Sequence, residues 1–254
     1  MIVERVCIGD SRGFTVYSLG KGSKCIAIYS PGGVRDVGSI AALNTLVREL
    51  REREPRFRVL IVPQLIEFEG PIHSVQLNPY ESRYLEMVCE RFSSYLAGCD
   101  LVIEVIGLES CEPHLVAQRE DLALGLPLVV EEPRSEILKL VSKDVGSVAQ
   151  LRICGGAEIS KEELLKTIEA LRTVLQSYTV GGSCPAVLRR TSYVYAPYDG
   201  VFVPETSVGS SVVAGDVIGS IYDRKIRAPI EGVVLALSRV RRVSVGNFVA
   251  LIAR

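Results

Sequence analysis

Tryptophan is absent from this sequence of 254 residues, and histidine and methionine occur only twice each. The scarcity of histidine restricts metal chemistry, because a catalytic zinc site takes about three protein ligands, usually histidines or carboxylates. His73 and His114 are the only imidazoles in the chain. A zinc centre made of histidines alone is therefore excluded.

The sequence also lacks long apolar runs and an excess of either charge. No segment approaches the roughly 20 apolar residues that a membrane helix needs. The formal net charge is −1, so no overall charge attracts nucleic acid or an anionic membrane surface. Glu4 and Arg5 interrupt any secretory signal at the start of the chain. We therefore expect a cytoplasmic protein with neither nucleic acid nor a membrane as a partner.

The seven cysteines are scattered and contain no CxxC pair. Their odd number and wide spacing argue against a disulfide framework of the secreted type. Cys25 and Cys99 stand beside apolar runs and are predicted to pack as free, buried thiols. The only spacing that resembles a metal half-site is Cys111-Glu-Pro-His114, in a stretch that reads as a loop.

The overall balance is that of a globular protein, with 48% hydrophobic and 23% charged residues. Asparagine and glutamine are few, whereas arginine and glutamate are plentiful. Depletion of heat-labile amides is typical of proteins from heat-loving organisms. We therefore expect a thermophilic source.

The first two thirds of the chain alternate between apolar runs and amphipathic segments. Residues 2–8 and 14–19 predict an antiparallel strand pair, and the apolar runs that follow predict buried strands. Ser160 and Glu163 form a capping box at the start of the clearest helix. The pattern predicts an α/β fold, with a mostly parallel or mixed sheet and helices on both faces. The predicted strands are 25–29, 57–63, 100–108, 126–132 and 147–154, and the predicted helices are a segment ended by Pro55, 78–98 and 160–178.

After a Gly/Pro linker at 179–187 the helical pattern disappears. Ala196-Pro-Tyr-Asp-Gly-Val-Phe-Val recurs as Ala228-Pro-Ile-Glu-Gly-Val-Val-Leu, which predicts two similar half-units packed as a small sandwich. This part resembles the barrel-sandwich fold of biotinyl and lipoyl carrier domains. We therefore predict an α/β domain at 1–180 and a small all-β barrel-sandwich module at 181–254. Lys225 lies near the junction where carrier domains display their modified lysine, although its spacing from Ala228 does not match theirs.

The two parts in this order resemble the succinylglutamate desuccinylase/aspartoacylase family, which has the zinc-carboxypeptidase fold. The resemblance covers roughly residues 20–254. It implies a zinc-dependent hydrolase that releases acyl groups from acylated amino acids. The family's motifs are Gly-x-His-Gly-Asp/Asn-Glu after a strand, Asn-Arg in a loop, Asp-Leu-His at a strand end, and a catalytic glutamate late in the domain.

This chain keeps the order of elements that the family has, but its residues differ at the family's metal-binding and catalytic positions. In SPGGVRDVGS, Gly32 stands at the first histidine ligand and Arg35 at the glutamate ligand. Asn78 is kept, but proline follows it where the family has its substrate-binding arginine. Ile106 replaces the second histidine ligand, and Arg152 replaces the catalytic glutamate. Glycine and isoleucine offer zinc no lone pair, and arginine stays protonated. We therefore expect no zinc there and no catalytic residue.

The substitutions leave positive charge where the family has a metal and two glutamates. Guanidinium groups bind carboxylates and phosphates. The leading hypothesis is a small-anion pocket formed by Arg35, Arg152 and Asn78 with the backbone of Gly32 and Gly33. In this hypothesis the protein is an anion binder or a subunit that pairs with an active deacylase or with itself. The structural alternative leaves Arg35 in solvent and pairs Arg152 with Glu104.

Three further interpretations stay open. An active metal-dependent hydrolase with relocated ligands would use zinc and draw on His73, His114, Cys111, Glu104 and Asp36. A carrier or scaffolding protein would need a modified or partner-contacting Lys225. The glycine turn in SPGG could cradle a phosphate, although neither nucleotide-binding glycine motif is present.

Overall fold

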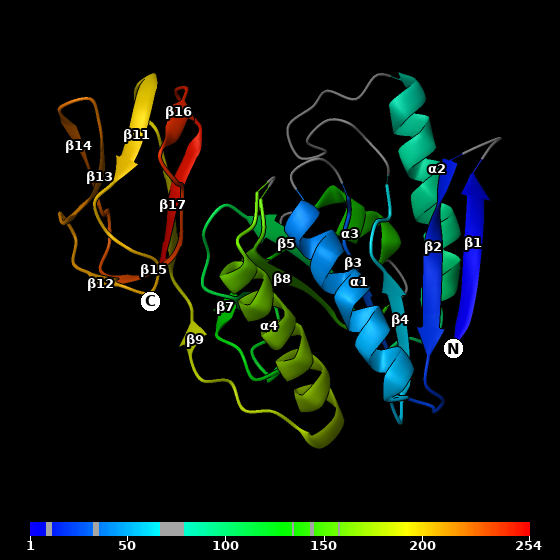
Figure 1. Cartoon of the computed structure of the whole chain (residues 1–254). Coiled ribbons are helices and arrows are strands. Elements are labelled where there is room, and N and C mark those ends of the chain that lie inside the picture. The colour runs from blue at the N-terminus through cyan, green and yellow to red at the C-terminus, as the bar shows by residue number, and fades with distance from the viewer. Residues whose placement is uncertain (9–11, 33–35, 67–78, 134, 143–144, 157) are drawn as a thin grey trace.

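The computed structural model describes residues 1–8, 12–32, 36–66, 79–133, 135–142, 145–156 and 158–254. Its larger part is a nine-stranded mixed sheet with helices on both faces (Figure 1). The sheet order is β1-β2-β4-β3-β5-β8-β6-β7-β9, and the predicted α/β architecture is confirmed. The strands are β1 Ile2–Ile8, β2 Arg12–Leu19, β3 Cys25–Tyr29, β4 Arg58–Val62, β5 Leu101–Leu108, β6 His114–Ala117, β7 Leu128–Val130, β8 Val148–Cys154 and β9 Val187–Leu188.

The centre of the sheet consists of the parallel strands β4, β3, β5 and β8. All five residues of β3 are buried, as expected for an apolar run covered on both faces. Helices α1 (Val37–Glu52) and α4 (Lys161–Val180) pack on one face. Helices α2 (Pro79–Leu96) and α3 (Glu136–Val141) cover the other. The predicted Ser160/Glu163 capping box opens α4. No helix in the described part of the chain is long and apolar enough to cross a membrane.

Two short elements were missed by the sequence analysis. The stretch from Cys111 to His114, which reads as a loop, runs into strand β6, and the short helix α3 was not predicted. Both are short, so local periodicity carries little information about them. Helix α1 ends at Glu52, ahead of Pro55, as predicted.

Cys25 and Cys99 form a disulfide and are not the free thiols that we predicted. They lie 74 positions apart in sequence, and their Cα atoms are 4.4 Å apart, within the range of bridged pairs. The sheet topology brings the two cysteines together, because Cys25 is the first residue of β3 and Cys99 precedes the neighbouring strand β5. The sequence spacing gave no indication of this contact.

A thiol titration tests this disulfide. In the unfolded, unreduced protein we expect five reactive thiols, because Cys7, Cys89, Cys111, Cys154 and Cys184 are free. Reduction should add the two thiols of the bridge. The Cys25→Ser variant should show the thiol of Cys99 without reduction. Seven thiols in unreduced protein, purified without a reductant, would contradict the bridge.

The C-terminal part consists of two four-stranded sheets, β10-β17-β15-β12 and β14-β13-β11-β16. The predicted repeat is visible in this arrangement. β11 and β13 occupy the centre of one sheet, and their repeat counterparts β15 and β17 occupy the centre of the other. The strands are β10 Thr191–Tyr195, β11 Gly200–Pro204, β12 Ser211–Val212, β13 Val217–Ile221, β14 Arg224–Arg227, β15 Gly232–Leu237, β16 Arg241–Val243 and β17 Phe248–Ala253.

The repeated glycine of the two half-units has a packing role. A Cβ atom at Gly232 would lie 2.4 Å from the carbonyl oxygen of Ala253, and one at Gly200 would lie 2.6 Å from the Cγ2 atom of Ile221. No side chain fits where the neighbouring strand approaches this closely. The glycines therefore set the spacing of strands in both halves of the module.

The two parts of the chain share an apolar junction. Cys111 forms an isolated antiparallel bridge with Ala236, and the backbone N–H of Glu112 donates to the carbonyl of Leu235 at 2.8 Å. Side chains from both parts form one buried cluster around Val116 and Leu251. Strand β9 belongs to the large sheet although it follows residue 180. The domain boundary between residues 180 and 181 stays a prediction.

Candidate functional site

The described candidate residues gather at one edge of the large sheet. Ile106 and Arg152 lie in the carboxyl-terminal halves of the neighbouring strands β5 and β8. Glu104 lies near the middle of β5, beside Tyr29 at the end of β3, and Gly32 follows that end. In open α/β sheets, the carboxyl ends of parallel strands form the usual binding edge. Gly33, Arg35, Asn78 and His73 are outside the described residues.

Ile106 and Arg152 are direct neighbours across β5 and β8. On its other side, Arg152 is paired in register with His114 of β6. The positions of the second histidine ligand and the catalytic glutamate, as the resemblance assigned them, are therefore adjacent in this fold. A hydrocarbon and a guanidinium occupy them.

Arg152 is 7% exposed and lies in a network of polar side chains. Its Nη1 donates to the hydroxyl of Tyr193 at 2.8 Å, and its Nη2 donates to Oε1 of Gln150 at 3.4 Å. The carboxylate that it contacts is Glu131, with 3.5 Å between Nη2 and Oε1. Gln150 stands between Arg152 and Glu104, so the link to Glu104 that we considered from the sequence is indirect.

Glu104 is fully buried and accepts three hydrogen bonds. Tyr29 and Ser135 donate to its Oε1 at 3.1 and 2.7 Å, and Gln150 donates to its Oε2 at 2.8 Å. Burial raises the pKa of the Glu104 carboxyl, while these three hydrogen bonds and the charge of Arg152 oppose that rise. Both carboxyl oxygens are occupied, so Glu104 is not poised to bind a metal ion.

The network extends into the β module. Glu131 accepts hydrogen bonds from the hydroxyls of Tyr193 and Thr191, both on β10. The sequence analysis missed Glu131 and Tyr193. The one sequence signal was Gln150, a polar residue beside Arg152 on the same face of an otherwise apolar strand. The described part of the site is therefore a set of compensated charges that joins the two parts of the chain.

Asp36 lies at the start of α1 and is 6% exposed. Its Oδ1 accepts a hydrogen bond from the backbone N–H of Gly107 at 3.3 Å. Burial raises its pKa to about 7, against this hydrogen bond. A Cβ atom at Gly38 would lie 2.4 Å from the Cα of Gly155, and one at Gly107 would lie 1.9 Å from the carbonyl oxygen of Gly155. The backbones of α1 and of the segments at the ends of β5 and β8 are therefore in direct contact, and the carboxyl of Asp36 is buried at this contact.

Cys111 and His114 form a pair without the properties of a reactive dyad. Their Sγ and Nδ1 atoms are 3.7 Å apart, and Nδ1 also lies 2.8 Å from the carbonyl oxygen of Glu112. Because a carbonyl only accepts, Nδ1 carries a proton. Burial lowers the pKa of His114 to about 4 and raises that of the Cys111 thiol well above its usual range. Neither a thiolate nor an imidazolium is favoured.

These residues do not make a zinc site. In the ranges that the structure describes, no three side chains among histidine, cysteine, aspartate and glutamate come together in a group that could hold an ion. Gly32, Ile106 and Arg152 have no donor atom for zinc. Among the described residues, the donor set is therefore that of a packed polar network and does not fit the metal that the fold family implies.

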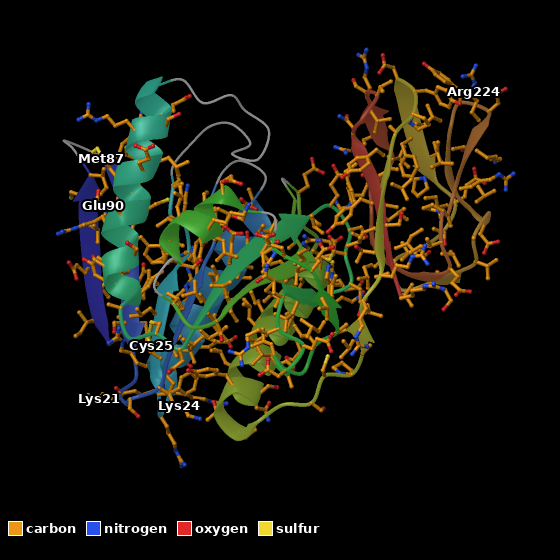
Figure 2. The ribbon with its side chains drawn as sticks, turned by 180° about the vertical axis from the view of Figure 1, so that it is seen from behind. Lys21, Lys24, Cys25, Met87, Glu90 and Arg224 are labelled. Carbon is orange, nitrogen blue, oxygen red and sulfur yellow. A yellow bond between two sulfur atoms is a disulfide. The ribbon has the colours of Figure 1, made fainter. Side chains whose placement is uncertain are left out.

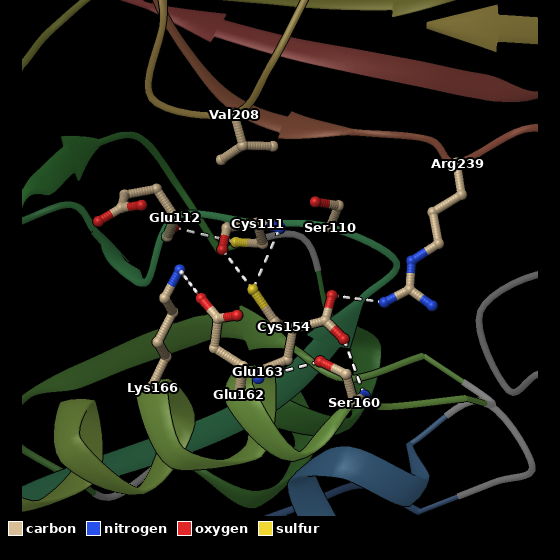
Figure 3. Close-up of a pocket in the computed structure, with 10 residues that line it drawn as sticks. All are labelled: Ser110, Cys111, Glu112, Cys154, Ser160, Glu162, Glu163, Lys166, Val208 and Arg239. Carbon is tan, nitrogen blue, oxygen red and sulfur yellow. Dashed lines mark hydrogen bonds and ion pairs between the residues drawn. The ribbon is translucent and has the colours of Figure 1, made fainter.

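A cavity of about 440 Å³ lies beside the junction, between the start of α4 and the β module (Figure 3). The thiol of Cys154 points toward the backbone of Cys111 at its wall (Figure 3). Two ion pairs line it, Lys166 with Glu162 at 3.2 Å and Arg239 with Glu163, and Glu112 adds a further carboxylate. The cavity therefore offers no surplus of positive charge to an anion.

Lys225 lies in β14 and not at the hairpin tip. It pairs in register with Ser220, and its Nζ forms an ion pair with Oε1 of Glu205 at 2.8 Å. The turn is formed by Tyr222 and Asp223. Lys225 is thus placed as a paired strand residue.

The fold is that of the aspartoacylase and succinylglutamate desuccinylase structures. An aspartoacylase family protein from Mesorhizobium loti superposes with a TM-score of 0.70 at 19% identity, covering 100% of this chain and 98% of that one. The product-bound ectoine utilization protein EutE from Ruegeria pomeroyi gives 0.71 at 16% identity, with 99% and 98% covered. A succinylglutamate desuccinylase/aspartoacylase from Rhodobacter sphaeroides gives 0.67 at 19%, with 95% and 87% covered.

No family model matches the sequence, and no curated protein matches it either. At these identities the structural likeness establishes the fold and leaves the activity open. The resemblance noted in the sequence is confirmed at that level.

Proposed function

We propose that this protein is a divergent member of the succinylglutamate desuccinylase/aspartoacylase family that no longer hydrolyses amides. The observation that carries this proposal is the in-register pair Ile106 and Arg152 at the carboxyl edge of the sheet. Amide hydrolysis in a zinc site needs a metal to activate water and a base to accept its proton. Isoleucine and arginine supply neither.

The proposed role is the binding of a small anion, a carboxylate or a phosphate, at this edge. Arg152 supports it because this cation stands at the position that the resemblance assigns to the catalytic glutamate. The proposal adds Arg35 and Asn78 to the pocket. Glu131 already offsets part of the Arg152 charge, so the proposal assigns an essential share of the binding to Arg35. The role of a partner subunit for an active deacylase is the alternative outcome, and it requires no anion.

Metal analysis and activity test the loss of hydrolysis. The purified full chain, grown with zinc, is expected to carry less than stoichiometric zinc. It should release no acid from N-acetylaspartate or N-succinylglutamate above the uncatalysed rate. Stoichiometric zinc whose removal by a chelator abolishes such a hydrolase activity would overturn the proposal.

Thermal melting with succinate and phosphate tests the anion pocket. At about ten times Kd, an anion stabilises the folded state by about 1.4 kcal/mol, which raises Tm by about 3–6 °C for a chain of this size. Arg35→Gln and Arg152→Gln should each reduce that rise, whereas Arg119→Gln, an exposed arginine paired with Asp121, should keep it. A wild-type protein whose Tm moves with neither anion would remove the anion-binding role and leave the partner role.

A further inference from the structure

A second cavity, of about 290 Å³, lies at the opposite edge of the sheet. It is formed where β3 and β4 begin and α4 ends. Figure 2 shows Lys21, Lys24 and Cys25 at this end of the molecule. The residues that line it are Gly22, Ser23, Lys24, Arg56, Phe57, Tyr178 and Thr179.

The two backbone segments that form the cavity are packed directly on each other. A Cβ atom at Gly20 would lie 2.1 Å from the carbonyl oxygen of Phe57, and one at Gly22 would lie 3.0 Å from that of Arg56. Gly20 also has a φ of +72°, which favours glycine. The backbone N–H of Arg58 donates to the carbonyl of Lys24 at 2.9 Å. Residues 20–24 are therefore held in one conformation against residues 55–58.

This packing places two cations at one cavity without a carboxylate partner. Within the ranges described, neither Lys24 nor Arg56 takes part in an ion pair or a side-chain hydrogen bond, and both are exposed. The nearby carboxylate of Asp100 is engaged elsewhere, by the N–H of Cys25 at 2.7 Å and the hydroxyl of Tyr178 at 3.0 Å. Two like charges held at one cavity raise its potential and attract an anion.

The other walls suit an anion that carries an organic group. The rings of Phe57 and Tyr178 contact each other, with centroids 5.2 Å apart, and form an apolar side. Ser23 adds a hydroxyl donor beside the two cations. A guanidinium and an ammonium together match the oxygens and charge of a phosphate group better than those of a monocarboxylate.

We propose that this cavity is a binding site for a small phosphate-bearing anion. Lys24 and Arg56 bind the phosphate, and Phe57 and Tyr178 contact the organic part. The site is distinct from the carboxyl edge and does not depend on the function proposed above.

Calorimetric titration of the full chain with inorganic pyrophosphate tests the site. The wild type should bind it saturably, and the double variant Lys24→Gln/Arg56→Gln should bind at least tenfold more weakly. Lys21→Gln is the control for Lys24, because it removes one positive charge from the same segment at a residue that does not line the cavity. We expect it to change Kd by less than twofold. All three side chains are exposed, so the variants should keep the wild-type circular dichroism spectrum.

Three outcomes would overturn the proposal. One is a wild type that shows no saturable binding of pyrophosphate at millimolar concentration. Another is a Lys21→Gln variant that weakens binding as much as the double variant, which would indicate diffuse charge. The third is loss of binding in Arg152→Gln with retention in the double variant, which would place the anion at the carboxyl edge. Failure of this site leaves the function proposed above untouched, because that function rests on the opposite edge.

Discussion

Replacement of Glu104 by alanine is expected to lower the free energy of unfolding by at least about 3 kcal/mol. The substitution leaves three buried donors, from Tyr29, Ser135 and Gln150, without their acceptor. Each unsatisfied donor costs about 1–3 kcal/mol, and the lost side chain adds a cavity term. The loss is measured by urea denaturation at constant pH, with the slope of the transition checked for two-state behaviour.

Glu104→Gln is the matched control for this prediction. Its amide oxygen can still accept from Tyr29 and Ser135, but its NH₂ group faces the NH₂ of Gln150. The amide of Gln150 could flip so that its oxygen faces the new NH₂ group. Its own NH₂ would then face Arg152, whose Nη2 donates to the Gln150 oxygen in the wild type. The glutamine variant should therefore lose stability, but less than the alanine variant. An alanine variant within about 1 kcal/mol of the wild type would show that the three donors find other partners.

The strands and helices around this network could be predicted from local sequence patterns. The buried strands were predicted because the apolar runs of β3, β4, β5 and β8 are continuous, and the helices because their apolar residues recur at helical spacing. The two halves of the β module were predicted from a repeat about 32 residues long. These signals are local, so a single sequence carries them.

The partners of the site residues were not predictable in this way. Arg152 was singled out, but its contacts with Glu131 and Tyr193 join three distant segments of the chain. The disulfide between Cys25 and Cys99 depends on the adjacency of β3 and β5. Sheet order decides such contacts, and the sequence alone did not give that order. The polar residue Gln150 in an apolar strand was the one local indication of a buried network.

The buried carboxyl of Asp36 is expected to make stability depend on pH. Its pKa rises from 3.8 to about 7 on folding because burial disfavours the charged form. The folded state therefore holds a proton that the unfolded state releases, between about pH 4 and pH 7. The stability that comes from this group is complete below about pH 4 and is lost as the pH rises through 7. The loss amounts to about 4 kcal/mol, at about 1.36 kcal/mol for each pKa unit.

Asp36→Asn tests this dependence, because the amide is neutral at every pH and its oxygen can still accept from the N–H of Gly107. At about pH 8 the variant should be more stable than the wild type by up to about 4 kcal/mol, and near pH 4 the difference should vanish. Ser39→Ala is the control, since it alters the same turn, where Ser39 donates to the carbonyl of Asp36 at 2.9 Å, and removes no titratable group. It should shift stability equally at all pH values. A difference between Asp36→Asn and the wild type that stays constant with pH would show that the Asp36 carboxyl is charged in the folded protein and that the junction of α1, β5 and β8 admits water.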